Sequence, residues 1–144
     1  MNEAKNLFGE AHVRRYRETG GAVGHIWRRG ATILLLTTTG RKTGTKGTIP
    51  LIYVRDGEHY VIIASKGGAP EHPGWYRTLV AHPDGKIQVW DKVIPVRALT
   101  GTAADKKRVW PTMTAQWPDY DKYQAATKRD IPVASEVWQR DKAV

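Results

Sequence analysis

The chain contains no cysteine among its 144 residues. This absence excludes a disulfide framework, thiolate metal ligands and cysteine nucleophiles, and it is compatible with a reducing compartment. No apolar run approaches the ~20 residues that a membrane-spanning helix needs, and residues 1–8 lack the apolar core of a signal peptide. The sequence therefore predicts a cytoplasmic protein with one domain over residues 1–144.

The sequence also lacks the motifs of several enzyme classes. It contains no G-x-S-x-G elbow, no Walker motif and no obvious pair of carboxylates for acid–base work. Its five histidines, which are His12, His25, His59, His72 and His82, are scattered without metal-ligand spacing. Since triad, dyad and metal chemistry have no support, we expect an enzyme with this sequence to use a bound cofactor and no metal.

Acidic residues are few relative to basic ones. Asp and Glu total 14 against 23 Lys and Arg, which gives a formal net charge of +9. This surplus favours anionic partners, and nucleic acid, an anionic membrane face and a polyanionic small molecule all fit it. Residues 3–18 predict a basic amphipathic helix that ends at Gly20. It would either pack on the domain or associate weakly with the inner face of a membrane.

The rest of the pattern predicts mainly antiparallel β structure with peripheral helices. We expect strands at 31–39, 47–54, 59–64, 86–90, 92–100 and 131–138, and helices from Pro73 to a turn at 82–85, over 103–110 and over 118–128. Because the first strand is continuously apolar, it should be buried on both faces. Pro50 requires an edge, a bulge or a strand start, and Pro111 should kink its helix or start a new turn. A small barrel fits these elements best.

Two cationic corners rich in glycine follow the strands at 31–39 and 59–64. They read Gly-Arg-Lys-Thr-Gly at 40–44 and Ser-Lys-Gly-Gly at 65–68. Glycine allows a close approach of backbone N–H groups to a ligand, and Lys and Arg supply the counter-charge. If the two strands are parallel neighbours, one anion site would be formed by Arg41, Lys42, Ser65 and Lys66. The alternative is a pair of solvated loops.

Aromatic residues follow the second corner and recur near the C-terminus. Trp75 and Tyr76 are followed by Trp117, Tyr120 and Tyr123, whose spacing of three places them near one helical face. They would be core anchors or the walls of a slot for a flat ring. A barrel that binds single-stranded nucleic acid on aromatics is a less favoured alternative, because these aromatics lie on expected helices instead of strands.

Several segments in this order resemble the deazaflavin-dependent (F420-dependent) nitroreductase family of actinobacteria. They are LLLTTTGRKTG at 34–44, ASKGG at 64–68, the segment 73–76 and the segment 117–123, within a likeness that runs from about residue 31 to residue 134. The resemblance implies a split β-barrel of the FMN-binding type. It also implies coenzyme F420, an 8-hydroxy-5-deazaflavin with a polyglutamate tail, and reduction of a quinone, enone or nitro-type electrophile. The alternatives are an FMN-dependent oxidoreductase of the same fold and a non-catalytic deazaflavin carrier.

The same resemblance implies a set of site residues, with no nucleic acid and no metal among the ligands. The phosphate and tail of the cofactor would bind Arg41, Lys42 and Thr43. Ser65 and Tyr120 would act as catalytic residues by hydrogen-bonding the acceptor oxygen, where negative charge develops. Further cofactor contacts are expected from Gly47, Thr48, Ile49, Pro50, Leu51, Ile52, Ile63, Ala64, Ser65, Lys66, Gly74, Trp75, Tyr76, Arg77, Thr78 and Tyr120.

Overall fold

The structure is a computed structural model that describes residues 6–40 and 46–139. Its strands close into an antiparallel barrel with the order β1-β2-β3-β6-β5-β4. They are β1 (Ile33–Thr39), β2 (Lys46–Asp56), β3 (His59–Ile63), β4 (Asp84–Val89), β5 (Lys92–Thr100) and β6 (Val133–Trp138). The expected barrel is confirmed.

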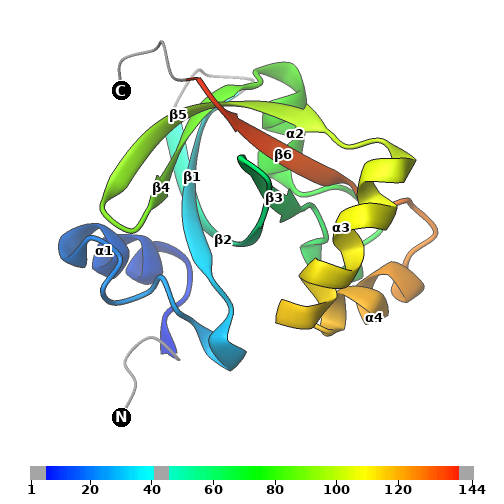
Figure 1. Cartoon of the computed structure of the whole chain (residues 1–144), viewed down its shortest axis with the longest axis horizontal. Coiled ribbons are helices and arrows are strands. Elements are labelled where there is room, and N and C mark those ends of the chain that lie inside the picture. Colours follow the sequence, from blue (N-terminus) through cyan, green and yellow to red (C-terminus); the bar gives the residue numbers. More distant parts are fainter. Residues whose placement is uncertain (1–5, 41–45, 140–144) are drawn as a thin grey trace.

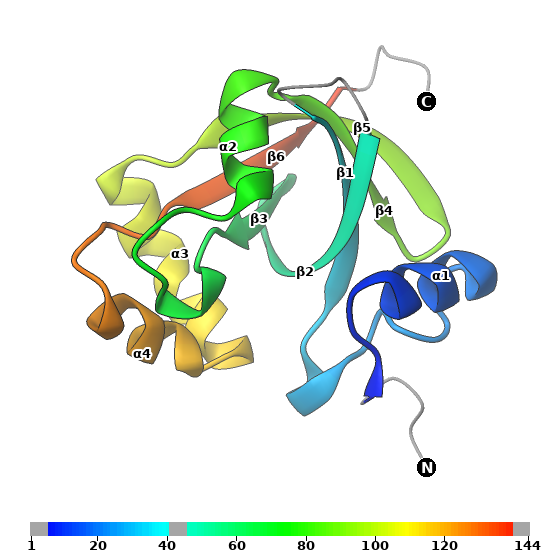
Figure 2. The same ribbon diagram turned by 180° about the vertical axis from the view of Figure 1, so that it is seen from behind.

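Helical segments cover the outside of this barrel. They are α1 (Gly9–Thr19), η2 (Arg28–Gly30), η3 (Lys66–Gly68), α2 (Gly74–Ala81), α3 (Ala103–Gln116) and α4 (Asp119–Ala126). Figure 1 shows α1 on one side of the lower barrel and the α3–α4 pair on the other. The reverse view in Figure 2 shows α2 above η3, with the strongly curved β2 between these elements and α1. Two helical blocks therefore flank one end of β2.

The apolar run of β1 is buried on both faces, as predicted. Leu34 and Leu36 belong to the cluster inside the barrel, whereas Ile33 and Leu35 pack outward against Tyr16 of α1. All four β1 side chains are at most 2% exposed. Because successive side chains of a strand point to opposite faces, a continuous apolar run is needed to satisfy both contacts.

Pro50 lies on a stretch of β2 that is paired on one side. Residues 46–52 pair with β1, and β3 pairs only with residues 53–56. Pro50 is opposite Leu35 of β1 and has no β3 partner in the described chain. Proline has no N–H to donate and is therefore tolerated at such an edge, which confirms the predicted edge position. The open edge borders the cavity described below.

The first helix starts later than the sequence pattern predicts. The expectation was a helix over 3–18, of which residues 3–5 lie outside the described chain. Among the described residues, Phe8 is extended with φ −147° and ψ 150°, and the carbonyl of Leu7 accepts a hydrogen bond from Trp27 Nε1 at 3.1 Å. This contact with a distant side chain replaces helical hydrogen bonding. The end is as expected, because Gly20 adopts a left-handed conformation with φ 59°.

The predicted turn at 82–85 is partly wrong, because β4 already begins at Asp84. Gly85 pairs with Val96 of β5. A Cβ at Gly85 would lie 2.7 Å from the carbonyl oxygen of Thr37 on β1. The glycine that suggested a turn is therefore needed for close contact between strands.

Helix α3 continues through Pro111 to Gln116, six residues beyond the predicted end. Its start is as expected: Thr102 and Asp105 form a reciprocal capping box. Proline removes one helical hydrogen bond, but Val109 and Met113, on either side of it, are buried in a cluster with α4. Tertiary packing therefore maintains the helix across the proline.

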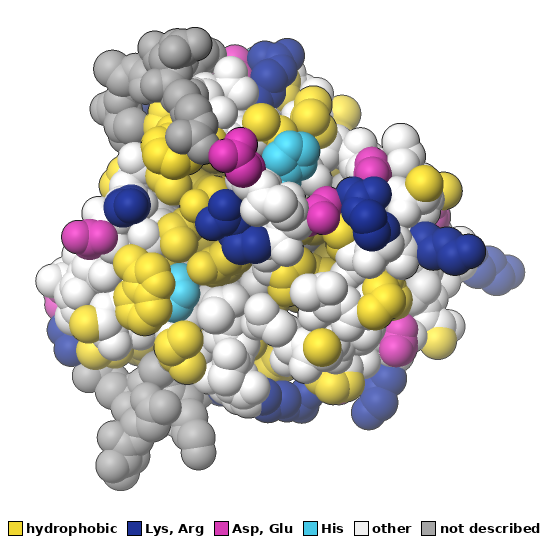
Figure 3. Space-filling view, in the orientation of Figure 1, with side chains coloured by type: hydrophobic (Ala, Val, Ile, Leu, Met, Phe, Trp, Pro, Cys, Tyr) yellow, Lys and Arg dark blue, Asp and Glu magenta, His cyan; other side chains and the backbone are white. Residues whose placement is uncertain are grey.

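Basic side chains are spread over the face of the molecule that Figure 3 shows. Figure 3 shows Lys and Arg side chains dispersed over one face, with Asp and Glu among them. The face in Figure 3 therefore offers separate basic groups instead of one large patch.

Within residues 6–40 and 46–139, no helix is long and apolar enough to cross a membrane.

Candidate functional site

The strands that precede the two cationic corners end at different places along β2. Strand β2 lies between β1 and β3, so the two strands run in the same direction but are not neighbours. In the ladder with β1, Lys46 is opposite Thr39 and Ile52 is opposite Ile33. The β3 end lies next to this second pair, about 20 Å along β2 from the first. The two strands are therefore not the neighbours that a single anion site was expected to need, and the roles of Arg41, Lys42 and Thr43, which lie outside the described residues, stay predictions.

A cavity of about 510 Å³ lies between the open edge of β2 and the surrounding helical segments. Its size is typical of a site for a small organic ligand. Most of its wall is apolar or aromatic. The lining residues are Phe8, Gly9, His12, Trp27, Ile33, Pro50, Leu51, Ile52, Ile63, Ser65, Lys66, Gly67, Pro73, Trp75, Trp117 and Tyr123.

Some of the expected ligand residues line this cavity and others do not. Those that line it are Pro50, Leu51, Ile52, Ile63, Ser65, Lys66 and Trp75. Those outside its lining are Gly47, Thr48, Ile49, Ala64, Gly74, Tyr76, Arg77, Thr78 and Tyr120. Two of the latter have other partners: the Tyr76 hydroxyl bonds Thr100 at 2.8 Å, and the Thr48 hydroxyl bonds Thr37 at 2.8 Å.

Tyr120 lies in a core cluster and not in the cavity wall. It is 5% exposed and packs with Val109 and Met113, and this burial raises the pKa of its hydroxyl. Three residues further along α4, Tyr123 lines the cavity, and its hydroxyl is 3.3 Å from the Trp117 Nε1 that donates to it. The structure thus places Tyr123, and not Tyr120, in the cavity wall, and the catalytic role expected for Tyr120 stays a prediction.

The Ser65–Gly68 corner has an uncommon backbone. Lys66 adopts φ 47°, which is rare for a residue with a side chain, and Gly67 and Gly68 follow with φ 61° and 84°. A Cβ at Gly68 would lie 2.7 Å from the carbonyl oxygen of Tyr123. The corner is therefore packed directly on the backbone of α4, which leaves no room for a side chain at Gly68.

Lys66 has an exposed carboxylate partner. Its ammonium group is 2.8 Å from Glu71, and each side chain is about half exposed. The hydrogen bond from Lys66 lowers the pKa of the Glu71 carboxyl. Exposed ion pairs contribute little free energy, so an anionic ligand can exchange with Glu71 at small cost.

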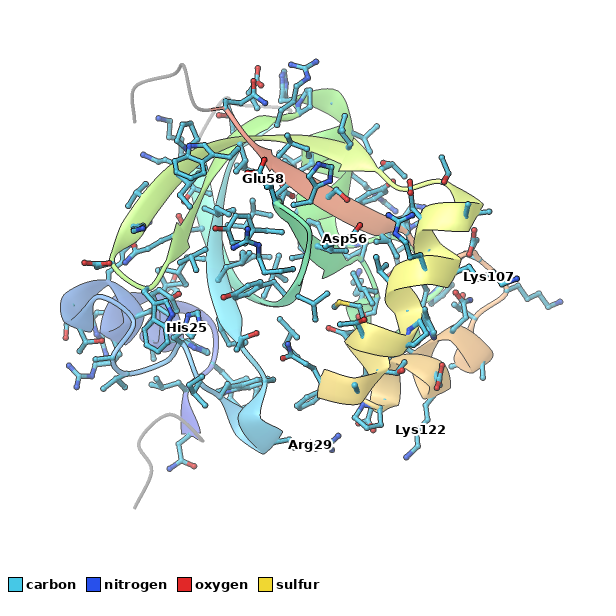
Figure 4. All side chains as sticks on the ribbon, viewed as in Figure 1. His25, Arg29, Asp56, Glu58, Lys107 and Lys122 are labelled. Atoms are coloured by element: carbon cyan, nitrogen blue, oxygen red, sulfur yellow. The ribbon has the colours of Figure 1, made fainter. Side chains whose placement is uncertain are left out.

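The opposite wall of the cavity comes from the N-terminal segment, which the sequence analysis did not assign to the site. Trp27 stacks on Trp117 with ring centroids 5.6 Å apart and an interplanar angle of 15°. The Arg29 guanidinium lies 4.3 Å from the Trp117 ring and 3.4 Å from the Asp119 carboxylate. Figure 4 shows Arg29 between the N-terminal segment and the α3–α4 pair. The sequence signal was Trp27 followed by two arginines, but nothing local related it to residue 117.

Two histidines of the N-terminal segment have fixed partners. His12 lines the cavity and bonds the Gly24 carbonyl through Nε2 at 2.9 Å. His25, labelled in Figure 4, lies between the hydroxyls of Tyr16 and Tyr53. Burial lowers the pKa of His12 and lowers that of His25 to about 4, so both rings are neutral at pH 7. In the described residues, no cluster of three or more His, Asp or Glu side chains could hold a metal.

Comparison with known proteins identifies the family. The family model for F420H(2)-dependent quinone reductase matches residues 9–137. An F420H(2)-dependent quinone reductase of Mycobacterium tuberculosis (strain H37Rv) is 42% identical over 125 residues, which cover 85% of this chain and 84% of that protein.

Two solved structures have the same fold. One is described as an F420-H2 dependent reductase, FDR-A, with 39% identity, a TM-score of 0.67 and coverage of 72% of this chain and 92% of that chain. The other, described as a domain-swapped dimer, has 36% identity, a TM-score of 0.69 and coverage of 86% and 92%. The resemblance found in the sequence is confirmed, and this split-barrel chain belongs to the F420H(2)-dependent quinone reductase family, whose members are oxidoreductases that use coenzyme F420.

Proposed function

We propose that this protein transfers a hydride from reduced coenzyme F420 to a quinone, or to an enone or nitro-type electrophile, inside the cavity at the open edge of β2. The observation that carries the proposal is the meeting of this edge, the Ser65–Gly68 corner and five Phe, Trp and Tyr side chains around one space of about 510 Å³. These side chains are Phe8, Trp27, Trp75, Trp117 and Tyr123, of which Trp27 and Trp117 stack on each other.

The residues present fit the cofactor. A deazaflavin ring is flat, with apolar faces and polar edges. The cavity wall between Pro50 and Ile52 is apolar, and the strand edge there has no β3 partner in the described chain. Lys66 adds a cation whose present partner, Glu71, is exposed and replaceable. When bound, reduced coenzyme F420 supplies a hydride from C5 of its ring.

The chain itself has three tasks in this reaction. The aromatic walls hold the acceptor flat against the ring and exclude water, because hydride transfer requires donor and acceptor carbons to be held roughly 3–3.5 Å apart. Ser65 and Tyr123 are the hydroxyls in the cavity lining that can donate to an acceptor oxygen as it gains negative charge. Lys66 provides positive charge at the corner.

Titration with coenzyme F420 tests this function. The reduced coenzyme is added to the purified protein and its absorbance is followed with and without menadione. We expect saturable binding and oxidation that depends on menadione. Absence of binding would contradict the proposal, whereas binding without oxidation would support a carrier, or a different acceptor. Flavin absorbance of the purified protein would favour the FMN-dependent alternative.

A pair of variants with opposite charge effects tests the place of the anionic part of the cofactor. Lys66→Ala should weaken cofactor binding about tenfold, since it removes one charge-assisted hydrogen bond. Glu71→Gln removes the competing carboxylate and should leave binding unchanged or tighten it. Lys42→Ala is also expected to weaken binding if the tail binds Arg41, Lys42 and Thr43. Equal affinity in Lys66→Ala and the wild type would show that the anion site is elsewhere.

Weak association with an anionic membrane face stays a prediction, and exposed side chains of the N-terminal segment support it. Phe8 and Ile26 are 58% and 46% exposed, and the Arg28 guanidinium lies 4.2 Å from the Phe8 ring. An exposed apolar group beside cations suits the boundary between headgroups and acyl chains. Sedimentation with vesicles of phosphatidylglycerol against vesicles of phosphatidylcholine, with Phe8→Ser as the comparison variant, measures this association.

A further inference from the structure

A guanidinium group from the segment after α4 lies behind the Ser65–Gly68 corner. The side chain of Arg129 donates three hydrogen bonds to main-chain oxygens. They reach Ala64 from Nη1 at 3.1 Å, Ser65 from Nη2 at 2.7 Å and Ala69 from Nε at 2.8 Å. Because these oxygens lie before, within and after the corner, one planar group fixes both of its ends.

The fourth contact of Arg129 is with a neutral histidine. Nη1 is 3.0 Å from His72 Nδ1. Since a guanidinium group can only donate, Nδ1 accepts and carries no hydrogen. Burial and the nearby Arg129 charge lower the pKa of His72, which keeps the ring in this neutral form at pH 7. Four of the five N–H groups of the guanidinium therefore donate to groups in or next to the corner.

The main chain at Arg129 is in turn tied to α4. Gln124, on α4, donates from Nε2 to the Arg129 carbonyl at 2.8 Å and accepts at Oε1 from the Ile131 N–H at 3.0 Å. One residue before Gln124, Tyr123 contributes to the cavity wall. Arg129 thus connects the corner that bears Ser65 to the helix that bears the aromatic wall.

We propose that Arg129 is a positioning residue for the hydride transfer: by holding the main chain from Ala64 to Ala69, it keeps Ser65 and Lys66 in the geometry that receives the cofactor. This inference rests on the proposed function. Arg129 does not line the cavity, so it acts through the corner. The left-handed conformation of Lys66 is unfavourable for a residue with a side chain and persists only where its surroundings impose it.

Two substitutions separate the charge of Arg129 from its planar arrangement of donors. Arg129→Lys keeps the charge but supplies a single donor point in place of three fixed directions. Arg129→Ala removes both and leaves a space of about guanidinium size. Arg97→Lys and Arg97→Ala are the matched controls, because Arg97 is exposed and pairs only weakly with Asp84 at 3.3 Å.

Binding of oxidised coenzyme F420, measured by tryptophan fluorescence, is the first readout. We expect its Kd to rise about tenfold or more in both Arg129 variants, as for the loss of charge-assisted hydrogen bonds, and to stay within about twofold in the Arg97 variants. In steady-state assays, KM for the cofactor should rise by a similar factor, and KM for menadione by less. Guanidinium chloride at a few millimolar should restore part of the binding to Arg129→Ala, and sodium chloride at equal ionic strength should not.

Three outcomes would overturn the proposal. The first is a cofactor Kd in Arg129→Ala within about twofold of the wild-type value, which is less than one hydrogen bond is worth. The second is an equal rise of KM for cofactor and menadione without guanidinium rescue. The third is loss of the folded state in both variants, seen as the absence of a cooperative thermal transition, which would assign Arg129 to stability alone. Failure of the wild-type protein to bind coenzyme F420 is a different result and contradicts the proposed function instead.

Discussion

The carboxyl group of Glu136 is buried without a hydrogen-bond partner, and this makes the stability of the barrel depend on pH. Glu136 lies on β6 between Tyr60 of β3 and Ala98 of β5, and it is 0% exposed. Neither of its oxygens has a partner in the described structure. Burial raises the pKa of this carboxyl from 4.5 to about 8, because the charged form loses its hydration. Glu136 is therefore a neutral acid at pH 7.

The sign and size of the effect follow from this pKa. The folded chain retains the Glu136 proton to higher pH than the unfolded chain does. The contribution of this proton to the free energy of unfolding is therefore fully present below pH 4.5 and is lost as pH rises through about 8. At 1.36 kcal/mol per pKa unit, raising the pKa from 4.5 to about 8 corresponds to a total loss of about 5 kcal/mol. By pH 7 about 3 kcal/mol of this has been lost relative to pH 4.5.

Urea unfolding of the wild type and Glu136→Gln from pH 5 to pH 9 measures this loss. Glutamine has nearly the same shape and cannot ionise, so its own burial cost shifts the curve by a constant. We expect the free energy of unfolding of the wild type to fall relative to the variant by about 1.4 kcal/mol per pH unit up to pH 8. Glu10→Gln, at an exposed position of α1, is the control and should give a constant difference. Parallel curves for the wild type and Glu136→Gln would refute a buried, unpartnered acid.

Three further predictions concern the corner, the helix cap and the tyrosines. Gly68→Ala introduces a Cβ 2.7 Å from the Tyr123 carbonyl at φ 84°, and should lower stability by more than ~2 kcal/mol in urea unfolding and weaken cofactor binding; unchanged values would mean that the corner can move away from α4. Thr102→Ala removes the capping box and should cost about 1 kcal/mol of unfolding free energy without changing the cofactor Kd. Tyr123→Phe should lower kcat with menadione several-fold, which is the effect expected for the loss of one hydrogen bond, whereas Tyr120→Phe should leave kcat within about twofold of the wild-type value. A larger loss of kcat in Tyr120→Phe than in Tyr123→Phe would return the acceptor role to Tyr120.

Much of the barrel could be predicted because its signals are local. The apolar run 33–36 is long enough to cover two faces, and the two-residue loop Gly57-Glu58 joins β2 to β3 in a hairpin, as the turn composition indicates. The absence of an N–H group in Pro50 restricts it to an edge whatever its neighbours are. The capping box at Thr102 likewise depends on residues three apart.

The errors have a shared physical origin in contacts between distant residues. Pro111 does not end α3, because Val109 and Met113 are held in a cluster with α4. A spacing of three places Tyr120 and Tyr123 near the same helical face, yet about 60° of helical rotation separates them, enough to put one in the core and the other at the cavity.

By itself, the sequence determined the antiparallel barrel, the family and the cationic glycine corner that includes Lys66, because strand patterns, turns and motifs are properties of contiguous residues. Only the tertiary structure decided how these pieces combine. It placed β2 between β1 and β3, so these two strands are not neighbours, and it brought Trp27 against Trp117 and Arg129 against Ser65. These two side-chain contacts join residues more than 60 positions apart in the sequence. Their formation depends on packing over the whole chain, which a local sequence pattern cannot predict.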